Sequence, residues 1–184
     1  SQYPKVQPRL VVGNSESVEM RVAEHTLDVG FIEAPAHLPA LASEVCAEDE
    51  LQALCAPDHA LAHTKQADAA LLASFPMICR EPGSGTREVA DLWFEKQGIK
   101  ASSLNVVMEL GSPEAIKGLV RTGLGIALMS RATVGKELQL GHLVAVPLSP
   151  PLVRTLSMVY PRERFRSRLV DAFIAFAGSR LGLS

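Results

Sequence analysis

Residues 76–98 read PMICREPGSGTREVADLWFEKQG, and this stretch decides the fold. Its first five residues form a short apolar run that a Pro-Gly pair breaks. After the break, Val89, Leu92 and Trp93 recur at the three-and-four spacing that is typical of one helix face. The stretch therefore predicts a buried strand over residues 76–80, a glycine-rich turn, and then an amphipathic helix.

The turn between this strand and this helix has the composition of an anion site. It holds Gly83, Ser84, Gly85 and Thr86, which are small residues placed where the first helical turn leaves its backbone N–H groups unpaired. The positive end of the helix dipole points the same way, and Arg87 adds a fixed positive charge. Alternatively, Ser84 or Thr86 serves only as the helix N-cap. The local sequence leaves both interpretations open.

Patterns of known catalytic and nucleotide sites do not fit this turn. It lacks the third glycine of a dinucleotide fingerprint, the lysine of a P-loop and the spacing of a nucleophile elbow. The five histidines fall outside the predicted ligand-facing turns, so a nucleophile there would lack a base. His59 and His63 stand four apart, but no carboxylate or cysteine joins them in a metal-binding pattern. We therefore expect neither an enzyme nor a bound metal or cofactor.

Composition narrows the class of protein further. The chain has 184 residues, 47% hydrophobic and 21% charged, so it can bury one sizeable core or two smaller ones. Its net charge of −2 argues against nucleic-acid binding by this chain, because phosphate contacts need a concentrated basic surface. Cys46, Cys55 and Cys79 are an odd number within apolar stretches, which indicates buried free thiols and a reducing cytoplasm. Neither a signal peptide nor a membrane span is indicated.

Strand and helix signals alternate along the chain in two groups. Residues 8–13 and 27–33 predict strands on either side of a helix that Asn14 or Ser15 caps, the pattern of a right-handed parallel unit. Two extended segments connect the groups, and two connections imply two lobes. The other predicted elements are extended segments or strands at 43–48, 51–56, 104–109, 124–129, 142–148 and 153–160 and helices at 67–74, 112–123, 131–138 and 164–181.

The last predicted helix carries a broad apolar stripe that contains Phe165, Leu169, Phe173 and Phe176. A stripe this apolar predicts docking onto the rest of the chain. Four arginines at positions 162, 164, 166 and 168 occupy the remaining positions at its start, and we interpret them as a solvated face rather than a nucleic-acid patch.

Polar residues follow several predicted strands and mark a candidate ligand site. In open parallel sheets, ligands bind at the carboxyl ends of strands. Glu33 follows the strand at 27–33, Ser112 follows the one at 104–109, and Ser130 follows the one at 124–129. Together with the turn at 81–87, these positions favour a small anionic ligand that hydroxyls and N–H groups hold.

Five segments carry a resemblance to a known family: YPKV at 3–6, LDVGFIEAP at 27–35, AEDELQALCAPDHALA at 47–62, ICREPGSGTREV at 78–89 and GSPEAIKGLVRTGLGIALMS at 111–130. In this order and spacing they resemble the effector-binding domain of LysR-type transcriptional regulators. The resemblance implies an α/β chain of two Rossmann-like lobes with a cleft between them, a fold like a type 2 periplasmic binding protein. It assigns residues 1–55 plus 156–184 to lobe I and residues 56–155 to lobe II.

The resemblance also implies which residues contact an effector. The turn Gly83, Ser84, Gly85, Thr86 and Arg87 matches the effector-contacting turn of the second lobe, with Ser84 and Thr86 as the expected direct ligands. Two other helix starts, at Ser112 and Ser130, face the same cleft. Glu33 faces them from the first lobe, where it either touches the effector or gates the cleft.

The function implied by the resemblance is effector sensing in the cytoplasm. A small anionic metabolite or inorganic anion binds between the lobes, and the response passes through a homodimer or homotetramer to a winged helix-turn-helix DNA-binding domain. That domain, and the strand and helix that open family effector domains, are expected to be missing from this chain. The helix after Ser15 and the strand at 27–33 are either the isologous surface of the oligomer or ordinary core. The alternative function is a transporter's solute-binding protein of the same fold.

Overall fold

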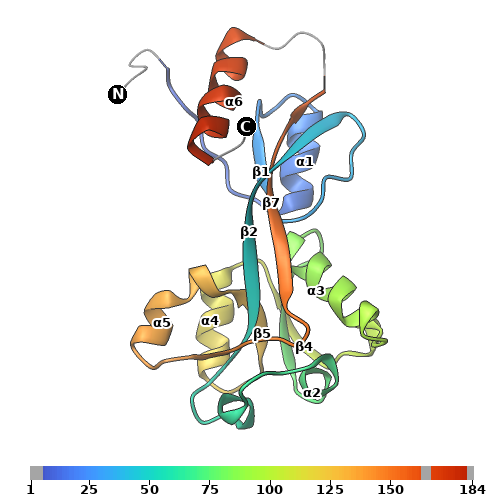
Figure 1. The fold of residues 1–184 in the computed structure, drawn as a ribbon, viewed down its shortest axis with the longest axis vertical. Coiled ribbons are helices and arrows are strands. Elements are labelled where there is room, and N and C mark those ends of the chain that lie inside the picture. Colours follow the sequence, from blue (N-terminus) through green and yellow to red (C-terminus); the bar gives the residue numbers. More distant parts are fainter. Residues whose placement is uncertain (1–5, 163–166, 182–184) are drawn as a thin grey trace.

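The computed structural model describes residues 6–162 and 167–181. Figure 1 shows two groups of elements that two long strands connect. We define the first group as α1 (Ser15–Ala23), β1 (Gly30–Ile32) and α6 (Arg168–Leu181). The second group contains α2 (Ala69–Ala73), β3 (Met77–Arg80), α3 (Gly85–Lys96), β4 (Val106–Leu110), α4 (Pro113–Arg121), β5 (Ala127–Ser130), α5 (Gly135–Gln139), β6 (Val144–Val146) and the 3-10 turns Ala60–His63, Ala101–Ser103 and Arg131–Thr133.

The connecting strands are β2 (Leu41–Cys55) and β7 (Leu152–Pro161), which run antiparallel beside each other through both groups (Figure 1). The predicted break between extended segments at 43–48 and 51–56 is wrong, because β2 is continuous. Glu48, Asp49 and Glu50 interrupt the apolar pattern that marks a buried strand, but they lie on a stretch of β2 that is partly open to solvent. The lobe boundaries at 55/56 and 155/156 remain a prediction, and the second falls inside β7.

The sheets contain more antiparallel strand pairs than the sequence predicted. The larger sheet has the order β1-β7-β2-β5, with β6 also paired to β2, and all its pairings are antiparallel. Only β3 and β4 form a parallel pair of named strands among the residues that the structure describes. The antiparallel pairing arises because β2 and β7 each serve both groups, which the alternation of elements along the chain does not reveal.

The predicted strand at 8–13 is wrong, and with it the predicted parallel unit. Residues 6–14 have no regular secondary structure, and Leu10 and Val12 are each 89% exposed. A strand needs a partner for its backbone N–H and C=O groups. Strand β7 pairs with β1 and β2, and no strand pairs with residues 8–13 among the described residues. The helix that follows is confirmed, with Asn14 as its N-cap: the Asn14 side chain accepts a hydrogen bond from the Ser17 amide.

Core packing fixes how the helices face. In α1, Val18 and Val22 pack against Ile32, Leu41 and Val159, so its apolar face is used within the chain, while Met20 is exposed. The predicted face of α3 is partly wrong, because Leu92 is exposed. Helix α3 is rotated so that Ala90, Trp93 and Phe94 enter the large core of the second group, with Val89 packed at its border.

The last helix docks onto the rest of the chain, as predicted, but only along one edge of its apolar stripe. Ile174 and Ala177 pack against Met158 and Tyr160, whereas Leu169, Phe173 and Phe176 are exposed, because the sheet contacts a narrow strip of α6. Phe165, Arg164 and Arg166 lie outside the described residues. Arg162 is tied to the sheet, since its side chain donates to the Leu41 carbonyl.

The three cysteines are free, as predicted. Cys55 is buried and the other two are half-buried. Burial raises the pKa of Cys55 to about 11. Burial also raises the pKa of Cys79 to about 11, although the positive charge of Arg87 works in the opposite direction. These thiols are therefore protonated at neutral pH and poorly nucleophilic.

Candidate functional site

The predicted turn at residues 81–87 forms the start of α3, where the two groups of elements meet. Gly83 has a positive φ of 83°, and a Cβ there would lie 2.4 Å from the Glu16 carboxylate oxygen Oε2. Glycine thus serves the backbone conformation, because the flexible Glu16 side chain could move aside from an added Cβ. The turn also contacts α1. The contact is direct, because the Glu16 amide donates to the Gly83 carbonyl at 3.1 Å and the Asn14 side chain donates to Glu81 at 3.3 Å.

Ser84 occupies the N-cap position of α3, but its side chain makes no capping hydrogen bond. The residue is only 2% exposed, and its Oγ finds no hydrogen-bond partner in the structure. A buried hydroxyl without a partner is rare and costs free energy. The Ser84 side chain therefore makes no capping hydrogen bond in the structure, and an unused hydrogen-bonding group lies at the positive end of the α3 dipole.

Gly85 brings the two groups into van der Waals contact. A Cβ at this position would lie 2.7 Å from both the backbone carbonyl carbon of Glu33 and the Ser15 Oγ. That serine also accepts a hydrogen bond from the Glu33 amide at 3.1 Å. The start of α3, the start of α1 and the end of β1 therefore form one tightly packed junction.

Thr86 and Glu33 meet at a buried arginine that the sequence analysis missed. The Arg154 Nη1 donates to Glu33 Oε2 at 2.6 Å and to Thr86 Oγ1 at 2.7 Å, and Thr86 in turn donates to Glu33 Oε2 at 3.1 Å. Behind them, Arg154 contacts the Asp49 carboxylate at 2.9 Å through Nε and at 2.7 Å through Nη2. Ser130 donates to the other Asp49 oxygen at 2.8 Å. These five residues form what we call the Arg154 cluster.

The Arg154 cluster joins elements from the whole chain. Glu33 follows β1, Thr86 lies in α3, Ser130 ends β5, and Asp49 and Arg154 are register partners across β2 and β7. A sequence signal for Arg154 exists: strand alternation puts it on the same face as its buried neighbour Leu152. A charged residue on the inward-facing side of an apolar strand indicates a buried ion pair, because burial of an unpaired charge costs too much free energy.

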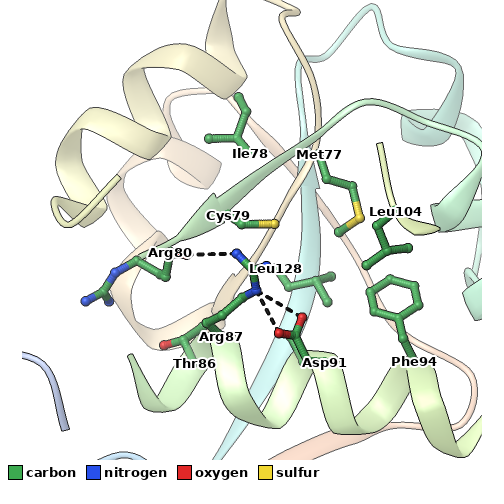
Figure 2. A pocket seen from close by; sticks show the side chains of 11 residues that line it. Met77, Ile78, Cys79, Arg80, Thr86, Arg87, Asp91, Phe94, Leu104 and Leu128 are labelled. Atoms are coloured by element: carbon green, nitrogen blue, oxygen red, sulfur yellow. Dashed lines mark hydrogen bonds and ion pairs between the residues drawn. The ribbon is translucent and has the colours of Figure 1, made fainter. Parts of the chain in front are cut away.

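Arg87 lies away from this cluster. Its Nε donates to Asp91 at 2.8 Å, and its Nη1 donates to Glu109 at 2.7 Å and to the Arg80 carbonyl at 3.2 Å. Figure 2 shows its guanidinium beside Cys79, at a cavity of about 20 Å³ that is large enough for one water molecule. Burial works to lower the pKa of Arg87, but the hydrogen bonds to Glu109 and Asp91 raise it. Its charge is already paired, so its role as a direct ligand stays a prediction without support from these contacts.

The other two predicted hydroxyls act as helix caps. The Ser112 Oγ accepts from the Ala115 amide at 3.3 Å, and Pro113 opens α4, as predicted. The Ser130 Oγ accepts from the Ala132 amide at 3.2 Å while it donates to Asp49. Ser130 thus joins the Arg154 cluster through Asp49, whereas Ser112 is exposed and apart from it.

An open pocket of about 280 Å³ borders the start of α3. Ser84 and Arg87 line it, together with Pro82, Gly83, Glu88 and Asp91. Burial of Glu81, which precedes Pro82 in the chain, would raise the pKa of that carboxyl, but the Arg80 guanidinium, 2.9 Å away, holds it below its ordinary value. The turn therefore borders an open pocket, while its Thr86 side chain faces the Arg154 cluster.

A second contact between the groups joins His37, in the loop before β2, to Glu88 of α3. The His37 Nε2 lies 2.9 Å from Glu88 Oε1. The backbone amides of His37 and Leu38 both donate to the Glu19 carboxylate of α1. The hydrogen bond that Glu88 accepts raises the pKa of His37. Partial burial opposes this, and the charges of Glu88 and Glu19 add to it.

This contact predicts a pH dependence of stability. Because the pKa of His37 is raised in the folded state, its contribution is fully present below the ordinary pKa near 6.5 and is lost as pH rises through the raised value. We expect His37→Gln to lower the melting temperature at pH 5.5 and to leave it unchanged at pH 8.5. His142→Gln, at an exposed histidine, is the control. Equal losses at both pH values would contradict a protonation-dependent contact.

The described residues hold neither a metal-binding cluster nor a helix that could cross a membrane. Over residues 6–162 and 167–181, no group of three His, Cys, Asp or Glu side chains could hold a metal ion. The His59 Nδ1 accepts from the Leu61 amide, so this ring caps a 3-10 turn. Within the same ranges, each helix is too short or too polar to cross a membrane.

Two groups of elements on a shared pair of long strands, with hydroxyl-bearing helix starts at their junction, define a two-lobed α/β domain of the periplasmic-binding-protein type. The chain belongs to the LysR substrate binding domain family, whose model matches residues 1–182. The predicted family and fold class, type 2 periplasmic-binding-protein-like, are confirmed. The family consists of transcriptional regulators, which also confirms that the chain is not an enzyme.

Named relatives support this assignment. Over 176 residues the chain is 42% identical to the uncharacterized HTH-type transcriptional regulator YeiE of Escherichia coli K12, covering 95% of this chain and 58% of the relative. It is 34% identical to the RuBisCO operon transcriptional regulator of Acidithiobacillus ferrooxidans, covering 96% of this chain and 56% of the relative. The chain thus spans under two thirds of the length of these curated relatives.

Solved structures agree with the fold. The Synechocystis CcmR regulatory domain in complex with 2-PG matches with a TM-score of 0.86 and 25% identity, covering 98% of this chain and 86% of that chain. The effector-binding domain of QuiR in complex with shikimate matches with a TM-score of 0.82 and 20% identity, covering 92% and 79%. The second likeness shows the fold alone.

Proposed function

We propose that this domain senses a small anion, such as a carboxylate, phosphate or sulfate, at the junction of its two groups. The unpartnered, buried Ser84 Oγ at the start of α3 is the observation that carries the proposal. An unpartnered hydroxyl at a helix N-terminus is a ready anion site. The proposed ligand-contacting residues are Gly83, Ser84, Gly85 and Thr86, with Arg87, Ser112 and Ser130 as further members. Glu33 lies at the same junction, where it either contacts the anion or gates its access.

The compound in the CcmR structure supports a small-molecule effector. CcmR holds 2-PG and QuiR holds shikimate. Either can be offered to this chain alongside phosphate and sulfate. The choice among them is an experimental one, because hydroxyls and N–H donors serve several oxyanions alike.

The response to the anion is proposed to be a population shift. A ligand that binds one arrangement of the two groups better than another changes their equilibrium by that difference in affinity. In a homo-oligomer this would change the spacing of attached DNA-binding domains and so control transcription in the cytoplasm. Exposed apolar side chains on the first group, including Phe31, Leu169 and Phe173, support an oligomer contact there rather than through the buried face of α1.

Thermal unfolding with phosphate, sulfate, 2-PG and shikimate tests the proposed site. A compound at a hundred times its dissociation constant should stabilise the parent by about 2.7 kcal/mol, which is roughly 5–10 °C for a chain of this size. Ser84→Ala should abolish that shift. It should leave the ligand-free melting temperature unchanged or higher, because the hydroxyl has no partner to lose.

Ser103→Ala is the matched control, since this exposed hydroxyl bonds only the nearby Lys100 carbonyl. It should keep the ligand shift. A loss of about 1 kcal/mol in ligand-free Ser84→Ala would mark Ser84 as an ordinary cap. No shift in the parent with any compound would contradict the anion site. Sedimentation of the same samples with and without the stabilising compound tests the oligomer step.

A further inference from the structure

The Glu33 carboxylate sits in the Arg154 cluster as a bound anion would. One oxygen, Oε2, accepts hydrogen bonds from both the Arg154 guanidinium and the Thr86 hydroxyl, at 2.6 and 3.1 Å. Two convergent donors, one of them charged, on a single oxygen are the recognition pattern of an oxyanion. The donors come from β7 and α3, and the acceptor comes from the end of β1.

We propose that Glu33 is a built-in competitor that the effector must displace from Arg154 and Thr86. This inference rests on the proposed function, because it names what an anion at this junction replaces. It makes Arg154, which the sequence did not single out, a specificity-determining residue. The ligand class that follows is a small oxyanion able to take both hydrogen bonds at once.

The burial of the cluster shows which partner is exchangeable. The Arg154 side chain is 5% exposed and Asp49 is 12% exposed, whereas Glu33 is 42% exposed. Asp49 binds Arg154 through two guanidinium nitrogens and is itself held by Ser130. Asp49 is therefore the permanent partner, and Glu33 covers the remaining Nη1 from the solvent side.

The charges require displacement rather than addition. Arg154 carries one positive charge against the two negative charges of Asp49 and Glu33. A further anion beside Glu33 would add like charge in a partly buried site, which is strongly unfavourable. A monoanion that replaces Glu33 keeps the local charge unchanged, and a dianion such as sulfate adds one negative charge, whereas either ligand beside Glu33 would add its whole charge. The exchange also breaks a contact between the end of β1 and α3, so ligand binding would alter the junction of the two groups.

Titration calorimetry with inorganic phosphate and with sulfate tests the displacement. Glu33→Gln removes the competing charge but keeps the side-chain size, and it should tighten binding of the same anion by roughly tenfold. The control is Glu16→Gln, which removes one negative charge beside Gly83 but lies outside the Arg154 cluster. It should change the affinity by less than about twofold, because an exposed charge is screened.

The possible outcomes separate this inference from the proposed function. If Glu33→Gln and Glu16→Gln change the affinity equally, the cause is general charge repulsion, and the displacement proposal is overturned. Weaker binding by Glu33→Gln would make Glu33 a ligand contact, which also overturns it. In both cases Ser84→Ala can still abolish binding, and the anion site stands. If phosphate and sulfate bind neither the parent nor Glu33→Gln, displacement fails; if none of the four panel compounds stabilises the parent, the anion site fails as well.

Discussion

Replacing Arg154 with methionine should lower the free energy of unfolding by about 3–5 kcal/mol, which is a fall of roughly 10 °C in melting temperature. The substitution keeps a long side chain but leaves the Asp49 carboxylate buried without its counter-charge. It also removes the donor that links Glu33 and Thr86. Chemical denaturation monitored by circular dichroism measures the change.

Two further variants make the Arg154 result specific. Arg131→Met changes an exposed arginine and should stay within about 0.5 kcal/mol of the parent. Adding Asp49→Asn to Arg154→Met removes the stranded charge and should recover part of the loss, as expected for residues that interact directly. A loss below about 1 kcal/mol in Arg154→Met would contradict a buried ion pair at the centre of the junction.

Gly85→Val should be nearly as damaging, with an expected loss of about 3 kcal/mol. The added Cβ alone would lie 2.7 Å from the Glu33 carbonyl carbon and 2.9 Å from its oxygen. These are backbone atoms, which cannot rotate aside as a flexible side chain can. The helix start must then move away from β1, and the contact between Thr86 and Glu33 is lost.

Gly118→Val provides the matched comparison for Gly85→Val. Gly118 lies in the middle of α4 with nothing within 4 Å of an added Cβ. Valine has the better helix propensity, so this variant should be neutral or slightly stabilising. Urea denaturation of both variants beside the parent measures the difference. Similar stability of the two variants would mean that the junction at Gly85 is not tightly closed.

The sequence predicted the stretch from β3 to α3 well, because its signals are local. An apolar run, a Pro-Gly break and a helical period specify a strand, a turn and a helix without reference to distant residues. The same holds for α4, where Ser112 and Pro113 mark the helix start. The local pattern could not predict the rotation of α3 about its axis. Phe94 is buried and Leu92 is exposed because of the core against which the helix packs.

Failures occurred where structure depends on partners far along the chain. The apolar run at 8–13 has strand composition, but β1 pairs with β7, and no strand pairs with that run among the described residues. The acidic stretch 48–50 resembles a break, yet its pairing with β7 keeps β2 continuous. The antiparallel partner of both β1 and β2, the strand β7, lies more than a hundred residues away along the chain.

The candidate site was predicted in part. The hydroxyls at the start of α3 and the carboxylate of Glu33 were identified, and the structure brings Thr86 and Glu33 together. Arg154 was missed because reasoning from strand ends considers only residues in turns, whereas this arginine lies within a strand. The signal that identifies Arg154 in the sequence is its place as a charged residue on the inward-facing side of an apolar strand. Whether these residues bind an effector stays a prediction.

The most direct test is a crystal structure of the chain grown with the compound that gives the largest thermal stabilisation. An anion site at the start of α3 predicts that compound within hydrogen-bonding distance of the Ser84 Oγ, with Thr86 beside it. The same compound bound elsewhere, with the Ser84 hydroxyl still buried and unpartnered, would contradict the proposed function.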